Sequence, residues 1–160
     1  MILLNEKLLN DEIKNIIFVC TGNTCRSPMA EAIMKMLLKE NGFDGIDVIS
    51  RGLSVYENAP ASDNSIEAIK KYDIDLTGHK AKLLTKEEVY NADLILTMGE
   101  SHKNVIISAF PDVAEKVFTI YEYAFSEEKD IADPFGGNIE VYENCLDEIY
   151  TCLNEIIKKS

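Results

Sequence analysis

The chain of 160 residues has little positive charge, because 16 lysines and arginines stand against 28 aspartates and glutamates and give a formal net charge of −12. No basic block stands out along the sequence. A protein that binds duplex nucleic acid needs a cationic face, and so does a protein that binds an anionic membrane surface. We therefore expect neither nucleic acid nor a membrane among the partners of this protein.

Long apolar runs and an export signal are also lacking. No run approaches the roughly 20 apolar residues that span a bilayer. The opening stretch MILLNEKLLNDEIK has no basic region before its leucines, and acidic residues interrupt it, so it does not resemble a secretion signal. We interpret residues 1–14 as a short amphipathic N-terminal extension. We expect a cytoplasmic protein in which the cysteines are thiols.

Linkers, internal repeats and low-complexity tracts are absent from the remainder, residues 15–160, which we expect to form a single domain. Short β-branched runs alternate with helical patterns, and this alternation predicts an α/β fold in which an open parallel sheet carries helices on both faces. The predicted strands are 15–20, 47–52, 93–98 and 116–121. The predicted helices are 27–42, 62–72, 85–92, 100–110 and 139–158.

The stretch CTGNTCRS contains two of the four cysteines, Cys20 and Cys25, and joins the first predicted strand to the first helix. Ligands bind at that edge of a parallel sheet. A zinc site is disfavoured, because the remaining pair, Cys145 and Cys152, lies on a predicted helix without ligand spacing. Two helical turns, ~10.5 Å of rise, also separate that pair too widely for a disulfide, so we expect it to pack in the core. The nucleotide-binding string GxxxxGK[ST] is missing. We therefore expect neither a zinc ion nor a nucleotide at this loop.

A phosphate-binding loop accounts for the whole stretch, whereas a buried pair of structural thiols leaves Arg26 unexplained. Five residues between Cys20 and Arg26 allow the backbone N–H groups to form an anion nest at the start of a helix. These donors favour a thiolate at Cys20, and Arg26 can hold two phosphoryl oxygens. Ser27 can donate a hydrogen bond to the sulfur. Gly22 permits a positive φ, and Asn23 can brace the loop with side-chain hydrogen bonds. The predicted phosphate-binding residues are Thr21, Gly22, Asn23, Thr24, Cys25, Arg26 and Ser27.

This C-x5-R-S pattern resembles the signature of the low-molecular-weight protein tyrosine phosphatases, and the resemblance extends over residues 15–158. The second fingerprint of that family, an Asp-Pro near the C-terminus, matches Asp133 and Pro134. The resemblance implies a four-stranded parallel sheet flanked by helices and catalysis without a cofactor. It also implies that Cys20 attacks phosphorus to form a phosphocysteine, that Arg26 holds the phosphoryl oxygens, and that Asp133 serves as acid and then base.

The substrate is indicated by two positions. Tyrosine-directed members of the family resemble one another in a bulky aliphatic residue before the second loop cysteine and in aromatic residues after Asp-Pro. Here these positions hold Thr24 and the stretch Phe135-Gly136-Gly137, which is most similar to the bacterial branch that acts on phosphoarginine in proteins. We therefore predict a protein-arginine-phosphatase, with a phosphotyrosine phosphatase as the alternative. An arsenate reductase and a non-catalytic phosphate-binding module are less favoured, the latter because Cys20 and Asp133 are both present.

Further expectations concern residues around the loop. We predict a reversible disulfide between Cys20 and Cys25 after mild oxidation, with simple packing of Cys25 beneath the loop as the alternative. We expect Arg51 to lie in solvent rather than reach the active site. We assign no catalytic role to His79 or His102. We expect a monomer.

Overall fold

The computed structural model describes residues 4–9 and 11–158. Four parallel strands form one sheet in the order β2-β1-β3-β4. The strands are β1 (Asn15–Cys20), β2 (Asp47–Gly52), β3 (Leu94–Thr97) and β4 (Val117–Thr119). The helices are α1 (Leu4–Leu9), α2 (Arg26–Glu40), α3 (Asp63–Ile69), α4 (Lys86–Asn91), α5 (Glu100–Ala109), α6 (Ile120–Phe125) and α7 (Ile139–Lys158), with 3-10 turns η1 (Lys70–Tyr72) and η2 (Pro111–Lys116).

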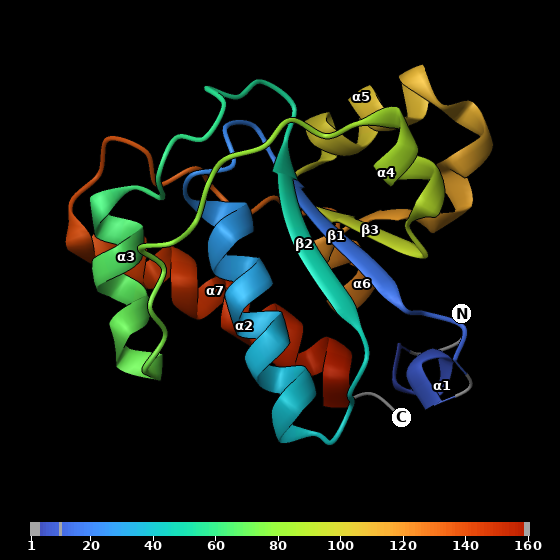
Figure 1. Ribbon diagram of the computed structural model, residues 1–160, viewed down its shortest axis with the longest axis horizontal. Coiled ribbons are helices and arrows are strands. Elements are labelled where there is room, and N and C mark those ends of the chain that lie inside the picture. The colour runs from blue at the N-terminus through green and yellow to red at the C-terminus, as the bar shows by residue number, and fades with distance from the viewer. Residues whose placement is uncertain (1–3, 10, 159–160) are drawn as a thin grey trace.

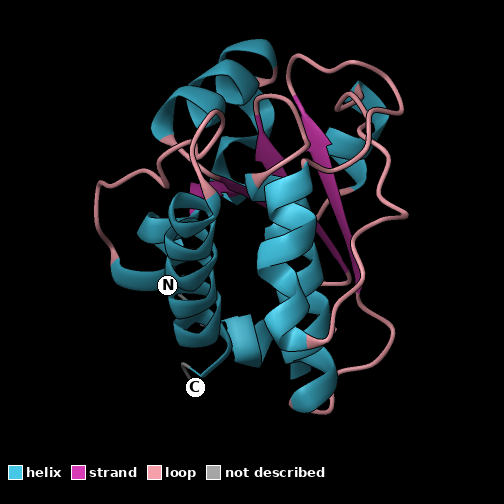
Figure 2. Ribbon diagram, turned by 90° about the vertical axis from the view of Figure 1, so that its left-hand side faces the viewer, coloured by secondary structure: helices cyan, strands magenta, loops and turns pink. Residues whose placement is uncertain are grey.

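Helices cover both faces of the sheet, as the sequence predicts. Alternate residues of a strand point to opposite faces, and in β1 the side chains of Ile16 and Phe18 enter one core while those of Ile17 and Val19 enter another. The first core lies under α1, α2, α3, α6 and α7, and the second lies under α4, α5 and η2. Figure 1 shows α2, α3 and α7 on one side of the sheet and α4 and α5 on the other, and Figure 2 shows the strands between the two groups of helices.

The fourth strand is shorter than predicted. It ends at Thr119 rather than at residue 121, because the hydroxyl of Thr119 accepts from the backbone N–H of Glu122 while the Glu122 carboxylate accepts from the backbone N–H of Thr119. This capping box starts α6 at Ile120. The helix predicted over 62–72 likewise ends early, at Ile69, and continues as the 3-10 turn η1.

The described part of the predicted extension packs on the same core as the rest of the chain. Leu4 and Leu8 of α1 are buried beside α7, and Ile13 joins them. The division of the chain at residue 14 stays a prediction. None of the described helices is both long and apolar enough to cross a membrane.

Candidate active site

The loop between β1 and α2 lies at the carboxyl edge of the sheet, where the sequence predicts it. The end of β2 holds this loop closely, since the backbone N–H of Leu53 donates to the carbonyl oxygens of Cys20 and Thr21 at 3.1 and 2.9 Å. A Cβ atom on Gly52 would lie 2.6 Å from the carbonyl oxygen of Thr21. Only glycine at this position lets the strand approach the loop so closely.

Asn23 fixes the conformation of the loop. Its φ is 57°, and its side chain is fully buried. The amide Nδ2 donates to Oγ of Ser27 at 2.8 Å, and Oδ1 accepts from the backbone N–H of Lys82 at 3.0 Å. The left-handed residue of the loop is Asn23 and not Gly22, although a glycine permits a positive φ. An asparagine tolerates this conformation, and here its side chain supplies hydrogen bonds that a glycine could not make.

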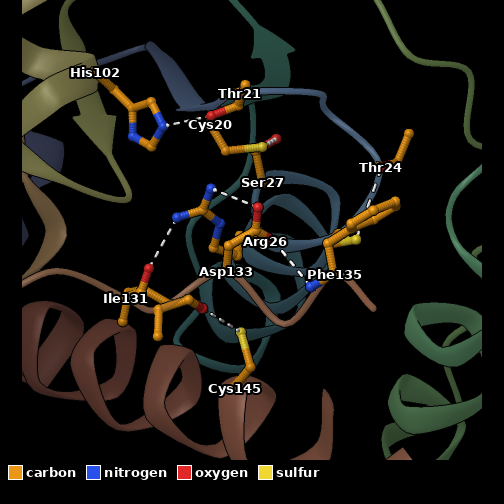
Figure 3. A network of polar contacts seen from close by, with 12 residues as sticks. Cys20, Thr21, Thr24, Arg26, Ser27, His102, Ile131, Asp133, Phe135 and Cys145 are labelled. Carbon is orange, nitrogen blue, oxygen red and sulfur yellow. Dashed lines mark hydrogen bonds and ion pairs between the residues drawn. The ribbon is translucent and has the colours of Figure 1, made fainter. Parts of the chain in front are cut away.

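Ser27 connects this network to the sulfur of Cys20. Its Oγ lies 2.8 Å from Sγ of Cys20 and 3.5 Å from the carbonyl oxygen of Arg51. Because Asn23 already donates to this oxygen, the hydroxyl proton is free to point at the nearer acceptor, the sulfur. A donor aimed at the sulfur stabilises negative charge there. Ser27 itself is buried behind the loop (Figure 3).

Arg26 joins the loop to the segment that contains Asp133. Its side chain is almost covered, with Nη1 donating to the carbonyl oxygen of Ile131 at 2.9 Å and Nη2 lying 3.6 Å from Oδ2 of Asp133 (Figure 3). The backbone N–H of Ile131 donates in turn to the carbonyl oxygen of Met98, just past β3. Oδ1 of Asp133 accepts from the backbone N–H of Phe135 at 3.1 Å. These contacts bring Asp133, which is far away in the sequence, to the loop that contains Cys20 and Arg26.

A cavity of about 260 Å³ opens above the loop. Tyr56 and Phe135 stand at its rim with 90% and 77% of their surfaces exposed, and Thr24 lies on the wall. Sequence reasoning missed Tyr56, although an aromatic residue shortly after the second strand is a usable signal for a residue near the carboxyl edge of the sheet. The lining consists of the loop from Cys20 to Arg26 together with Ser54, Tyr56, Ala59, Asp133 and Phe135.

Comparison with known proteins agrees with this geometry. The family model described as "Low molecular weight phosphotyrosine protein phosphatase" matches residues 15–159. The chain belongs to this family. The protein-arginine-phosphatase of Bacillus subtilis is 41% identical over 145 residues, which cover 91% of this chain and 95% of that protein. The low molecular weight protein-tyrosine-phosphatase PtpB of Staphylococcus epidermidis is 41% identical over 141 residues, or 88% of this chain and 95% of that protein.

A solved structure extends the likeness to three dimensions. It is a cysteine-to-serine mutant of the YwlE arginine phosphatase with a phosphorylated active-site serine, and it superposes with a TM-score of 0.86 at 41% identity. The match covers 90% of this chain and 93% of that one. The four-stranded fold expected from the sequence is thereby confirmed as the fold of the family.

The other cysteines of this phosphatase are buried. Sγ of Cys25 lies beneath the loop, 3.4 Å from Oγ of Ser62 and 3.5 Å from the hydroxyl of Tyr142. Cys145 and Cys152 pack in the core along α7, as predicted, and burial raises the pKa of each thiol to about 12. All four thiols are unpaired in the structure, and the predicted link between Cys20 and Cys25 stays a prediction. Among residues 4–9 and 11–158, no group of three or more His, Cys, Asp or Glu side chains is placed to hold a metal ion.

The expectation that Arg51 lies in solvent is wrong. Its Nη2 is 2.7 Å from Oε2 of Glu88, and only 22% of its side chain is exposed. Glu88 lies in the first turn of α4, which packs beside β2, and this distant residue is invisible to local sequence reasoning. Arg51 therefore belongs to neither the solvent nor the cavity.

Two histidines contact the loop from outside the cavity. Nε2 of His79 lies 2.7 Å from the carbonyl oxygen of Asn23, and Nε2 of His102 lies 3.0 Å from Oγ1 of Thr21. Each is an isolated histidine in the sequence, without a spacing pattern that could have pointed to the loop.

Proposed function

We propose that this protein is a phosphatase that hydrolyses phosphoarginine in proteins through a phosphocysteine intermediate. The observation that carries the proposal is the position of Thr24, which lines the same cavity as Cys20. A threonine offers a hydroxyl to a polar guanidino group where an aliphatic side chain would offer only apolar bulk. The 41% identity to a protein named protein-arginine-phosphatase supports the same substrate.

The first chemical step transfers the phosphoryl group to sulfur. The thiolate of Cys20 attacks phosphorus, and the S–P bond forms as the P–N bond to the guanidino group breaks. The loop N–H groups and Arg26 hold the equatorial oxygens. Nη2 of Arg26 faces Asp133, and an incoming phosphoryl oxygen takes the place of this carboxylate as its partner. Asp133, in its protonated form, gives its proton to the leaving nitrogen.

The second step releases phosphate. A water molecule attacks the phosphorus of the phosphocysteine, and Asp133 accepts a proton from that water. The S–P bond breaks, and the electron pair returns to the sulfur of Cys20. Ser27, 2.8 Å from that sulfur, donates its hydroxyl hydrogen bond to the departing thiolate. The enzyme is then restored, and inorganic phosphate leaves the cavity.

The rim of the cavity suits a flat head group on a protein surface. Phe135 and Tyr56 are mostly exposed and flank the entrance, so they can contact the planar guanidino group and the chain that bears it. An open cavity beside exposed aromatic residues is accessible to a phosphorylated side chain that projects from a folded or extended protein. The cytoplasmic location and the monomeric state stay predictions from the sequence.

A phosphotyrosine phosphatase is the second candidate. It is favoured by the two exposed aromatic residues, Tyr56 and Phe135, which could stack on a phenyl ring. The likeness to PtpB of Staphylococcus epidermidis also supports it. An arsenate reductase with a resolving pair of cysteines is not supported, because Cys145 and Cys152 are held in the core of the molecule.

The decisive experiment compares two peptides of the same sequence, one with phosphoarginine and one with phosphotyrosine at the same position. We expect a larger kcat/KM for the phosphoarginine peptide, and we expect no turnover of either peptide by the Cys20→Ser variant. Preference for the phosphotyrosine peptide would instead identify the protein as a phosphotyrosine phosphatase, the second candidate. Absence of activity on both peptides would contradict the phosphatase proposal itself.

A further inference from the structure

A buried histidine contacts the phosphate loop but takes no part in the two steps above. His102 lies in the first turn of α5, just past the carboxyl end of β3, and is 6% exposed. Its Nε2 is 3.0 Å from Oγ1 of Thr21, the residue that follows the nucleophile (Figure 3). Its Nδ1 is buried and has no hydrogen-bond partner within the described ranges 4–9 and 11–158. Buried polar atoms are normally paired, so this arrangement requires an explanation.

The imidazole of His102 is neutral at neutral pH. Burial lowers its pKa from the ordinary value of 6.5, and the nearby guanidinium of Arg26 lowers it further. The carboxylates of Asp130 and Asp133 act in the opposite direction but do not reverse the shift. A neutral imidazole has one N–H donor and one bare nitrogen, so the ring must adopt one of two tautomers.

The surroundings of the ring select the tautomer. With the proton on Nδ1, a buried N–H donor would have no acceptor, and the protein would bear the full desolvation cost of that donor. With the proton on Nε2, the ring donates to Oγ1 of Thr21, and only a bare nitrogen stays unpaired. The Nε2–H tautomer of His102 is therefore the stable one.

This choice determines what the hydroxyl of Thr21 can do. A hydroxyl oxygen that accepts from Nε2–H keeps its own proton for donation. The described part of the chain offers that proton no acceptor, and Thr21 lines the cavity beside Cys20. A phosphoryl group bound in the cavity supplies an anionic acceptor at this place.

We propose that His102 is a positioning residue, whose Nε2–H orients the hydroxyl of Thr21 so that it donates its proton to a phosphoryl oxygen of the substrate. The proposal rests on the proposed phosphatase function for its substrate. Binding of inorganic phosphate to the same loop tests it independently of turnover. Thr21 thereby adds a side-chain donor to the backbone donors of the loop.

The tautomer can be measured directly. The chain has only two histidines, so long-range proton–nitrogen NMR of the rings gives two sets of signals, and the His102→Gln variant identifies one of them by its loss. We expect the Nε2–H form of His102 at pH 7. An Nδ1–H form or a charged ring at that pH would overturn the proposal.

Matched substitutions test the role of the hydrogen bond. Glutamine at position 102 places an amide N–H near the position of Nε2, whereas asparagine places it near Nδ1. We expect His102→Asn and Thr21→Val each to lower kcat/KM roughly 10- to 100-fold, the range for a lost hydrogen bond to a charged group. We expect His102→Gln to keep kcat/KM within about threefold of the native value. The double variant, His102→Asn with Thr21→Val, should lose no more activity than Thr21→Val alone.

The inhibition constant of inorganic phosphate separates this role from simple packing. This constant should rise by a similar factor in His102→Asn and in Thr21→Val, and it should stay close to the native value in His102→Gln. Two measurements test the inference even if the protein turned over neither phosphopeptide. They are the phosphate affinity, measured by direct titration, and the NMR tautomer of His102. Unchanged phosphate affinity in Thr21→Val would overturn it. So would losses that simply add in the double variant.

Discussion

Replacement of Thr24 by isoleucine tests the substrate assignment most sharply. The backbone of Thr24 is held independently of its side chain, because its carbonyl oxygen accepts from the backbone N–H of Ser62 at 2.9 Å. Among the described residues, the only partner of its hydroxyl is Sγ of Cys25, at a distance of 3.7 Å. The substitution therefore removes little from the folded loop. Its main effect falls on whatever occupies the cavity.

The magnitude follows from two opposite contributions. A hydrogen bond between the hydroxyl of Thr24 and a guanidino N–H, lost in a site shielded from water, is worth roughly 1–3 kcal/mol, or about 5- to 150-fold in rate. The added methylene of isoleucine contributes about 0.8 kcal/mol to burial of an apolar aryl ring, or about fourfold. The ratio of phosphoarginine to phosphotyrosine turnover should therefore fall by at least about 20-fold.

The assay measures kcat/KM of the native protein, Thr24→Ile and Thr24→Val on both phosphopeptides. Valine matches the shape of threonine without the hydroxyl, so it separates loss of the hydrogen bond from added bulk. We expect Thr24→Val to lose phosphoarginine turnover without gain on phosphotyrosine, and Thr24→Ile to show both effects. Equal losses on both substrates would mean that Thr24 only shapes the loop, and the reasoning from its hydroxyl would be refuted.

Three other predictions concern the reacting groups. Cys20→Ser should fold as the native protein does and lose turnover by several orders of magnitude, because an alkoxide is not available at neutral pH; appreciable residual activity in a stopped assay would remove Cys20 from the role of nucleophile. Asp133→Asn should retain phosphate binding and slow turnover most for substrates with poor leaving groups, and a rate loss independent of the leaving group would argue against an acid. Mild peroxide should link Cys20 to Cys25 reversibly, as mass spectrometry of the intact protein would detect; sulfinate on Cys20 without the link would contradict this.

The sequence was most informative where local pattern and local structure coincide. The apolar run of β1 and the loop that follows it are contiguous, so a candidate nucleophile, a guanidinium and a helix start could be recognised together. The distal Asp133 came from resemblance, since nothing local shows that its segment returns to Arg26. The capping box at Thr119 was overlooked, because the β-branched residues before Ile120 continue the pattern of a strand.

Contacts that fold distant segments together could not be predicted. Arg51 of β2 forms an ion pair with Glu88 of α4, and no local sequence pattern relates two positions so far apart in the chain. The same holds for His102, which contacts the loop, and for Tyr56, which lines its cavity. Both lie there because the parallel sheet brings the ends of its strands to one edge. The left-handed turn falls on Asn23 rather than Gly22, because the buried side chain there makes two hydrogen bonds, to Ser27 and to the backbone of Lys82.

The tether between Arg26 and the backbone of Ile131 has a consequence for the kinetics of the protein. The segment that contains Asp133 is hydrogen-bonded to Arg26 and to Met98 through the backbone of Ile131. In an enzyme whose catalytic acid lies on a lid that must close, this closing motion can limit the turnover rate. Here these contacts hold Asp133, the proposed acid, beside the cavity. We therefore expect the turnover rate to be set by bond breaking at phosphorus and to be insensitive to the viscosity of the solvent.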